Sequence, residues 1–519
     1  MEQKRKRLLL SGNEAVAHGA FEAGVTVAAA YPGTPSTEIM EHMATFKEVD
    51  AQWSVNEKVA YEVALGASFG GARSLYACKH VGLNVAMDPL MTSIYTGING
   101  GYVVVVADDP GMHSSQNEQD TRWVSIYAKM PYLEPATPQE AHDMMIDAYQ
   151  ISEQFDTPVM VRLTTRISHT KEDVEIGERQ NVARKDFTID AAKYVMVPGH
   201  AYRRHIILEK RLDQLRDFAE KSPLNTIEKG SADLGIITAG VPYTYVKETY
   251  PDASILKLGM PYPFPDDLIR TFAQSVKELV VIEELDPFLE EHLKAMGIAV
   301  RARHKSWRIG ELRPEFITPI VKGEEKEEKA AGTRKPQLCK GCPHGFVYET
   351  LKKLNVTVSG DIGCYTLGAL PPLSSVHTCV CMGAGVTIHE GLRRGGVDGR
   401  VVGVVGDSTF IHSGITGLIN AVYNKAKGLI MILDNSTTAM TGGQNHPGTG
   451  RSIRDEIAPT LNLEELCRSC GVQNVDVIRP NARKELEELI AKRLDEDALS
   501  VIITRSPCLL TMRKNKAKK

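Results

Sequence analysis

Two short polar segments of this sequence follow long apolar runs and could hold a metal ion. Gly406, Asp407 and Ser408 come directly after "RVVGVV", and Asn435 follows "GLIMILD". Each apolar run is typical of a strand buried on both faces, and the stretch at about 414–427 is predicted to be helical. A strand–helix–strand unit makes its two strands parallel, so we expect Asp407 and Asn435 at carboxyl ends of strands in one sheet.

The residue types at these two positions indicate which ligand they could hold. A carboxylate and an amide oxygen are hard ligands of the kind that Mg²⁺ takes together with phosphate oxygens. The small residues around Asp407 let the backbone approach a phosphate, and the next helix offers its N-terminal N–H groups. Taken alone, Gly-Asp-Ser would more simply be a turn with a capping Asp407. The matching Asn435 on a second parallel strand favours the metal site.

The Gly-Asp-Ser segment with its distant Asn resembles the diphosphate-binding motif of thiamine diphosphate enzymes. In those enzymes a second domain supplies a glutamate that hydrogen-bonds the cofactor's aminopyrimidine ring. The segment "NEKVAYEVALGASFGGAR", 56–73, resembles that element. The resemblance implies that Glu57 exchanges a proton with the ring and so activates the cofactor. The alternative is a first-turn glutamate in favourable interaction with the helix dipole.

Further segments narrow this resemblance, and they span nearly the whole chain in the family's order. Together they resemble the α subunits of indolepyruvate:ferredoxin oxidoreductases, which belong to the 2-oxoacid:ferredoxin oxidoreductases. The segments are "YPGTPSTE" (31–38), "NEKVAYEVALGAS" (56–68), "KHVGLNVAMDPLM" (79–91), "VVADDPGMHSSQNEQDTR" (105–122), "CKGCPHG" (339–345), "GDIGCYTLGALPPL" (360–373) and "AMTGGQNHPGTG" (439–450).

This resemblance implies oxidative decarboxylation that depends on thiamine diphosphate and Mg²⁺. The substrates would be coenzyme A and an aryl 2-oxoacid such as indolepyruvate or phenylpyruvate, and the products an aryl-acetyl-CoA, CO₂ and two reduced ferredoxins. The expected partners are a smaller β subunit, in an α2β2-type hetero-oligomer, and an electron acceptor that is ferredoxin or a partner redox subunit. Two alternatives stay open: a non-oxidative 2-oxoacid decarboxylase or carboligase, and a cofactor-binding scaffold subunit without chemistry of its own.

The resemblance also assigns roles to single residues. It implies Asp407 and Asn435 as Mg²⁺ ligands, with a backbone carbonyl near Thr437 as a third. Thr34 would contact the carboxylate or keto oxygen of the substrate, or equally cap a helix before Pro35.

The remaining candidates lie in matching motifs, and each could equally be a structural residue. They are His344 and Cys364 near the cofactor, and His80 and Asn84 near the substrate.

Nine cysteines include two C-x-x-C pairs, Cys339/Cys342 and Cys467/Cys470. The pairs are much farther apart than the ~15–20 residues typical of zinc ribbons, which disfavours a shared metal site. By resemblance the first pair lies in a loop that opens the diphosphate-binding domain. The family continues into a segment with cysteines for two [4Fe–4S] clusters, whereas none follows Cys508 here. We therefore expect no iron–sulfur cluster on this chain, and a redox centre on a partner.

The elements that must position these residues alternate between strand-like and helical patterns. The expected fold is multi-domain α/β, a thiamine diphosphate-binding fold with mostly parallel sheets flanked by helices. By resemblance its parts are a pyrimidine-binding domain, a transketolase-C-like middle domain, a charged linker and a diphosphate- and Mg²⁺-binding domain. Their predicted ranges are 1–190, 191–322, 323–336 and 337–519.

Composition excludes several other classes of protein. The 519 residues carry a net charge of −4, with 42% hydrophobic and 24% charged residues, as in an ordinary globular protein. Nucleic acid and membranes are therefore not expected as partners. The apolar runs are strand-length, and the N-terminus lacks a signal-peptide core. An odd number of scattered cysteines favours reduced thiols in the cytoplasm.

Overall fold

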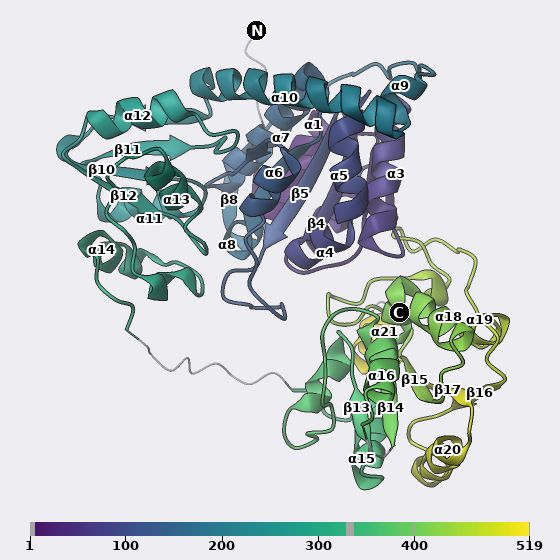
Figure 1. Cartoon of the computed structure of the whole chain (residues 1–519). Coiled ribbons are helices and arrows are strands. Elements are labelled where there is room, and N and C mark those ends of the chain that lie inside the picture. Colours follow the sequence, from purple (N-terminus) through teal and green to yellow (C-terminus); the bar gives the residue numbers. More distant parts are fainter. Residues whose placement is uncertain (1–5, 328–336, 398–399, 518–519) are drawn as a thin grey trace. The chain divides into compact units, whose positions relative to one another are not determined.

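The computed structural model describes residues 6–327, 337–397 and 400–517, and forms two compact units, 1–329 and 330–519 (Figure 1). The division between the units falls inside the predicted linker, 323–336, of which residues 328–336 lie outside the described residues. The finer domain boundaries stay predictions.

The first unit contains a six-stranded sheet in the order β3-β2-β4-β5-β7-β6, and every neighbouring pair is parallel. Its central strands β4, β5 and β7 are buried along their whole length, which explains their nearly continuous apolar sequence. The strands are β2 Val27–Ala30, β3 Asp50–Trp53, β4 Ser74–Lys79, β5 Tyr102–Asp108, β6 Tyr132–Leu133 and β7 Val159–Thr164. A separate antiparallel pair joins β1 Lys6–Ser11 to β8 Lys171–Ile176.

Helices connect these strands, and their ends follow ordinary capping chemistry. The helix α7, Pro138–Phe155, begins directly after Thr137, because the Thr137 hydroxyl accepts the Glu140 N–H and Pro138 occupies the first turn. The other helices are α1 Gly12–Glu22, α2 Thr37–Met43, α3 Glu57–Phe69, α4 His80–Val85, α5 Met87–Thr96, α6 Arg122–Ala128 and α8 Thr165–His169.

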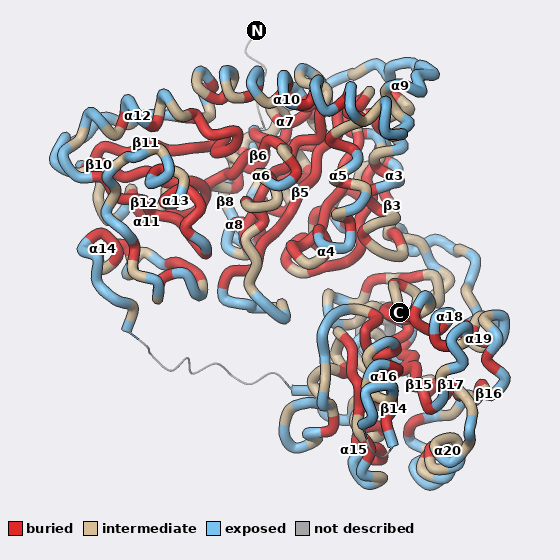
Figure 2. Tube along the Cα trace, in the orientation of Figure 1, coloured by how far each residue is buried: buried red, intermediate tan, exposed pale blue. Residues whose placement is uncertain are grey.

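A four-stranded sheet in the order β12-β10-β11-β9 completes the first unit, and only β9 is antiparallel to its neighbour. Residues from one of its faces, such as Leu256, join a single apolar core with residues from the six-stranded sheet, such as Val104. Figure 2 shows the strands of both sheets as mostly buried. The elements are α9 Ala191–Tyr194, α10 Pro198–Lys221, β9 Asn225–Glu228, β10 Ser231–Thr238, α11 Pro242–Thr249, β11 Ala253–Leu258, α12 Asp266–Gln274, β12 Glu278–Ile282, α13 Phe288–Ala295, η1 Lys305–Arg308 and α14 Pro314–Lys322.

One buried ion pair also links the two sheets, and two more lie within the segments of the six-stranded sheet. The Arg122 guanidinium at the start of α6 contacts Glu283, just after β12, at 2.7 Å, and both side chains are 2% exposed. Arg162 in β7 contacts Asp108 at 2.9 Å and Glu134 at 2.5 Å. Removing one partner of such a pair leaves an uncompensated buried charge, which typically costs about 3–5 kcal/mol.

The second unit is built on a five-stranded sheet in the order β13-β14-β15-β17-β16, with all neighbours parallel. Alternate residues of its strands enter two separate cores: Leu429 and Met431 pack with α15 and α20, whereas Ile430 and Ile432 pack with α16, α18 and α19. The sheet is therefore buried on both faces. Its strands are β13 Thr357–Ser359, β14 Val401–Gly406, β15 Gly428–Asp434, β16 Asn474–Ile478 and β17 Leu499–Arg505.

The helices of the second unit are short, and they differ from the prediction after β14. The chain makes one helical turn, α17, Asp407–Thr409, then a π-helical turn, η3, Phe410–Gly414, before α18, Ile415–Tyr423. The others are α15 Pro343–Lys353, η2 Cys364–Ala369, α16 Ala384–Arg394, η4 Pro447–Thr449, α19 Leu463–Ser469, α20 Arg483–Asp495 and α21 Leu509–Ala517.

The predicted α/β class with mostly parallel sheets flanked by helices is confirmed. None of the helices within the described ranges is both long enough and apolar enough to cross a membrane.

Glu284, the neighbour of Glu283, makes stability depend on pH. Its Oε1 accepts the Leu312 N–H at 2.9 Å, and burial raises its pKa from 4.5 to about 7 despite that hydrogen bond. A carboxyl group whose pKa is raised by folding stabilises the native state at low pH, and this contribution is lost as pH rises from 4.5 towards 7. We predict that Glu284→Gln removes roughly 3 kcal/mol of this pH dependence, because the amide resembles the protonated acid.

The measurement is denaturant unfolding of both proteins at several pH values between 4.5 and 8. The matched control is Glu291→Gln, which changes an exposed carboxylate on α13. If the free energy of unfolding falls equally with rising pH in the Glu284 variant and in the control, the Glu284 carboxyl group does not cause the pH dependence.

Candidate functional site

Asp407 and Asn435 lie together, as the sequence predicts. β14 and β15 are adjacent and parallel, and each of these residues directly follows the carboxyl end of its strand. The Ser436 N–H donates to Asp407 Oδ2 at 2.8 Å, so the two loops are in direct contact. His446 Nε2 lies 3.2 Å from the same oxygen. Both of these contacts involve Oδ2, and the Asp434 side chain also interacts with the Asp407 carboxyl group.

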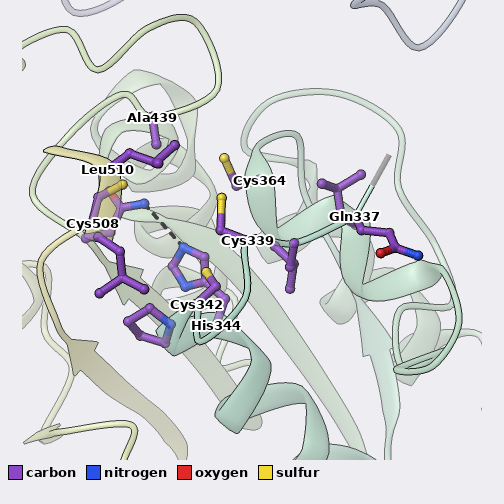
Figure 3. Close-up of a pocket in the computed structure, with 13 residues that line it drawn as sticks. Gln337, Cys339, Cys342, His344, Cys364, Ala439, Cys508 and Leu510 are labelled. Carbon is purple, nitrogen blue, oxygen red and sulfur yellow. Dashed lines mark hydrogen bonds between the residues drawn. The ribbon is translucent and has the colours of Figure 1, made fainter. Parts of the chain in front are cut away.

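Asn435 connects this pair to His344. Its Nδ2 lies 3.2 Å from His344 Nε2, the hydrogen bond drawn in Figure 3. Burial lowers the pKa of His344 to about 4, so the ring is neutral and Nε2 can accept the amide proton. Asn435 Oδ1 accepts the N–H of Thr437 at 3.2 Å. The three predicted metal ligands therefore lie on one short turn and the loop beside it.

The charges around Asp407 fit a divalent cation. Asp407 is 2% exposed, and Asp434 next to it is also buried. Arg505 contacts Asp434 at 2.6 Å, but no lysine or arginine of the described residues forms an ion pair with Asp407. A buried carboxylate needs a compensating charge, and a hard cation with oxygen ligands supplies it.

Backbone geometry around this turn is tight. A Cβ added at Gly406 would lie 2.4 Å from the Tyr365 ring, so only glycine fits there. The Ser408 hydroxyl lies 2.8 Å from that of Thr438, in the loop after β15. The π-helical turn at Phe410–Gly414 follows at once, and such turns occur frequently at functional sites.

Asp361 is a positioning residue that the sequence analysis did not single out. Its carboxylate accepts the N–H groups of Gly383 at 3.0 Å and Gly385 at 2.8 Å, at the start of α16. Burial raises the pKa of Asp361 to about 6 against the effect of these bonds. A Cβ on Gly385 would lie 2.3 Å from the Val404 carbonyl, so the start of α16 packs directly onto β14.

Four thiols line one pocket of about 70 Å³ next to Asn435 (Figure 3). They are Cys339, Cys342, Cys364 and Cys508, and His344 and Asn435 line the same pocket. Burial, together with the neighbouring thiols, raises the pKa of Cys342 and brings that of Cys364 to about 11. The volume exceeds what one water molecule needs, so a small group fits.

The second C-x-x-C pair does not join this pocket. Cys467, a residue of α19, is fully buried in the core that α19 covers, and Cys470 packs against the same core. Across the described ranges, no three His, Cys, Asp or Glu side chains are placed to hold a single metal ion. The four thiols are thus not arranged around one ion.

The sequence pattern did not show these four cysteines as one set. The family resemblance implied only that Cys364 lies near the cofactor, and Cys508 was only the last cysteine in the sequence. Cys364 follows β13 and Cys508 follows β17, so both lie at the same sheet edge as Asp407. Because the carboxyl ends of parallel strands share one edge of the sheet, the positions of Cys364 and Cys508 after strand-like segments could have predicted that they lie near Asp407.

Glu57 lies in the first unit, at the start of α3. Asn56 caps this helix by accepting the Val59 N–H at 2.9 Å, and Glu57 is 4% exposed. A Cβ added at Gly82 in α4 would lie 2.7 Å from Glu57 Oε1. The carboxylate therefore packs against bare backbone, in a dry setting suited to proton exchange with a ligand.

Thr34 lines a cavity of about 530 Å³ at the carboxyl edge of the six-stranded sheet. His80 and Asn84 do not line it. His80 is fully buried, and burial lowers its pKa to about 4. Asn84 is exposed and its Nδ2 donates to Gln119 at 2.9 Å. Their predicted substrate contacts stay predictions.

Comparison with known proteins identifies both halves of the chain. Residues 18–214 match the family model described as pyruvate flavodoxin/ferredoxin oxidoreductase, thiamine diphosphate-binding. Residues 361–504 match the C-terminal thiamine pyrophosphate-binding domain of thiamine pyrophosphate enzymes, and include Asp407 and Asn435.

Curated relatives cover nearly all of the chain. Indolepyruvate oxidoreductase subunit IorA of Archaeoglobus fulgidus is 39% identical over 97% of this chain and 87% of its own length. The Pyrococcus abyssi protein of the same name is 40% identical over 97% and 86%. This chain belongs to the IorA family. The predicted α-subunit resemblance is thus confirmed, and the chain is an oxidoreductase subunit with thiamine diphosphate-binding domains.

A solved structure supports the fold of the IorA chain. The 2-oxoglutarate:ferredoxin oxidoreductase of Magnetococcus marinus superposes with a TM-score of 0.51 at 18% identity, covering 61% of this chain and 65% of its own.

We predict that Asp407→Asn abolishes Mg²⁺-dependent retention of thiamine diphosphate. The substitution keeps an oxygen for the Ser436 N–H but removes the buried negative charge. Cofactor that stays with the protein through gel filtration, with and without Mg²⁺, is measured by its fluorescence after oxidation. Asp497→Asn, an exposed carboxylate of the same unit, is the control. Equal Mg²⁺-dependent retention by both variants would contradict the assignment.

Proposed function

We propose that this IorA-family chain oxidatively decarboxylates an aryl 2-oxoacid with coenzyme A. In the balanced reaction, one 2-oxoacid anion and one CoA thiol give one acyl-CoA, one CO₂, one proton and two electrons. The electrons reduce two one-electron acceptors of the ferredoxin type. The observation that carries this proposal is the buried Asp407–Asn435 turn on adjacent parallel strands, inside the domain that matches thiamine pyrophosphate enzymes.

Asp407, Asn435 and the Thr437 backbone would hold Mg²⁺, which in turn would bind the diphosphate of the cofactor. When bound, thiamine diphosphate supplies a carbon nucleophile and accepts the electron pair left by CO₂. Ser436 and His446 contact one oxygen of Asp407 and so orient the carboxylate. His344 fixes the Asn435 amide from the other side.

Glu57 would hold the proton that activates the cofactor. Its carboxylate is buried against the backbone of Gly82, where water does not compete for the proton. Thr34, half-buried in the wall of its cavity, would donate its hydroxyl to the substrate's carboxylate or keto oxygen.

The thiol pocket would supply the electron acceptor on this chain. A [4Fe–4S] cluster is held by four cysteine thiolates, and four cysteines line this pocket. Because a cluster is larger than a single metal ion, its thiolate ligands lie farther apart than those of a one-ion site. This arrangement favours a cluster here, where the sequence analysis expected none. Cys339, Cys342, Cys364 and Cys508 would bind it, and the electrons would pass on to ferredoxin or a partner subunit.

The partner would be a smaller β subunit in an α2β2-type complex, because the relatives are named as subunits. All nine cysteines are free in the structure, which supports a reducing cytoplasmic location.

The direct test purifies the chain with its accompanying subunits under anaerobic conditions and supplies phenylpyruvate, CoA and an acceptor dye. Formation of phenylacetyl-CoA with dye reduction supports the proposal. Release of phenylacetaldehyde without CoA dependence would instead establish the non-oxidative alternative.

We predict that Glu57→Gln abolishes turnover and leaves thiamine diphosphate binding nearly unchanged, since the amide keeps the shape but cannot exchange the proton. Steady-state rates and cofactor titration measure the two effects. The control is Glu62→Gln, an exposed position on the same helix. A Glu57 variant with normal activity refutes the role.

We predict that Cys508→Ser, purified anaerobically, loses most of its iron and acid-labile sulfide, because one of four ligands is gone. Cys470→Ser, outside the pocket, keeps the wild-type content. Iron, sulfide and the electron paramagnetic resonance spectrum of the reduced protein are measured. Wild-type protein without iron would show that the pocket holds no cluster.

A further inference from the structure

The segment 187–207 carries an unusual share of the exposed apolar side chains. Of the 22 large hydrophobic residues that are exposed in the described ranges, seven lie within these 21 residues, and Ile189 and Tyr202 are 89% and 73% exposed. Single exposed apolar residues are ordinary on a protein surface, but a cluster of them marks a contact surface for another molecule.

The helix α10, which lies along the outside of the first unit (Figure 1), shows where this surface ends. Its inner face is buried, and Leu208 joins the core that the two sheets share. Before Leu208, Tyr202 and Ile206 are exposed one turn apart on the opposite face. After Leu208, all exposed residues of α10 are polar: Glu209, Lys210, Asp213, Gln214, Asp217 and Lys221. A helix that faced only water would be polar on its outer face along its whole length.

The segment before α10 is tied to the sheet although its side chains are exposed. The Lys185 N–H donates to the Gly71 carbonyl at 3.1 Å, and the Asn99 side chain donates to the Asp186 carbonyl at 3.0 Å. Gly71 precedes β4 and Asn99 precedes β5, so the segment crosses the amino edge of the six-stranded sheet. A partner bound here lies at the opposite edge of this sheet from the Thr34 cavity.

Asp156 fixes the two helices of this surface. Its carboxylate contacts Lys193 of α9 at 2.8 Å and Arg204 of α10 at 3.1 Å. Arg204 Nε also donates to the Tyr95 carbonyl, near the end of α5, at 2.7 Å. The backbone of the surface is therefore preformed, which lowers the entropic cost of binding a partner.

The surface has a basic border. Residues 184–210 contain six lysines and arginines and three acidic residues, whereas the whole chain has a net charge of −4. Arg203 and Lys210 are exposed and form no ion pair with another described residue. Two copies of this chain that docked symmetrically through the surface would bring their cations together, which disfavours a homodimer here. A partner with carboxylates around its contact area fits the charge instead.

We infer that residues 187–207 form the docking surface for the companion subunit of the complex, which presents an apolar contact area bordered by acidic side chains. The inference rests on the proposed function for the presence of that subunit, and the relatives are named as subunits. Tyr202 and Ile206 supply the apolar centre of the contact, and Arg203 belongs to its charged rim.

The experiment measures assembly directly. The chain is co-expressed with the smaller subunit that accompanies it, and dissociation of the purified complex is followed by mass photometry over a dilution series. Tyr202→Glu/Ile206→Glu raises the Kd of the complex by at least about 100-fold, because two apolar anchors become charges that the acidic border repels. Gln214→Glu, which adds a carboxylate at an exposed position later on α10, is the control and leaves the Kd unchanged.

Arg203→Glu tests the charge separately. It raises the Kd about 10-fold at low salt (~20 mM) and less than about twofold at high salt (~500 mM), since exposed charges are screened. Circular dichroism and the melting temperature of each variant chain show whether the exposed substitutions leave the fold intact.

A double variant that assembles with wild-type affinity overturns the inference, as does a wild-type chain that forms no complex with the smaller subunit. Loss of a homodimer in the double variant also overturns it, because the surface then joins two copies of this chain. Failure of the proposed function appears separately, as a complex that assembles through this surface but forms no acyl-CoA from phenylpyruvate.

Discussion

A parallel sheet covered by helices on both faces leaves only its ends for polar chemistry. In the second unit, Leu429 and Ile430 enter opposite cores, so neither face of the five-stranded sheet can hold a charged group without a partner. Asp407 and Asn435 are therefore found just beyond the strands, where backbone N–H groups and loop side chains supply partners. The six-stranded sheet follows the same rule with Thr34 at its carboxyl edge.

Charged groups also lie inside the first unit. Arg122 and Arg162 are almost completely buried there: Arg122 pairs with Glu283, just after β12, and Arg162 pairs with Asp108 and Glu134 from the segments of the six-stranded sheet. Such networks add little net stability relative to an apolar core, but a mispaired arrangement would leave bare charges. The Arg122–Glu283 pair thus helps to define how the six-stranded and four-stranded sheets meet. Glu311, from the loop beyond the four-stranded sheet, contacts Arg166 in the wall of the Thr34 cavity.

The sequence predicted those parts of the fold and site that depend on local pattern. Alternation of strands and helices predicted Asp407 and Asn435 at the carboxyl ends of parallel strands in one sheet, and the structure makes these strands neighbours. What the sequence did not predict depends on contacts between distant segments. Cys508 and Cys339 are far apart in the sequence and line the same pocket only because of the strand order of the sheet. The π-helical turn after Asp407 has no recognisable sequence pattern. Asn84 shares a motif with His80, but the short helix α4 directs one to solvent and buries the other.

Asn435 belongs to two sites at once. Its side chain contacts His344 and lines the thiol pocket, while its backbone carbonyl accepts the N–H of Cys508 at 3.0 Å. Any ligand that orders Cys508 therefore also orders a residue of the Asp407 turn. Such coupling is reciprocal: by thermodynamic linkage, filling the pocket changes the affinity of the turn for its ligand by the same factor as the reverse. Through one asparagine, a group bound in the thiol pocket and a ligand of the Asp407 turn would share a common binding equilibrium.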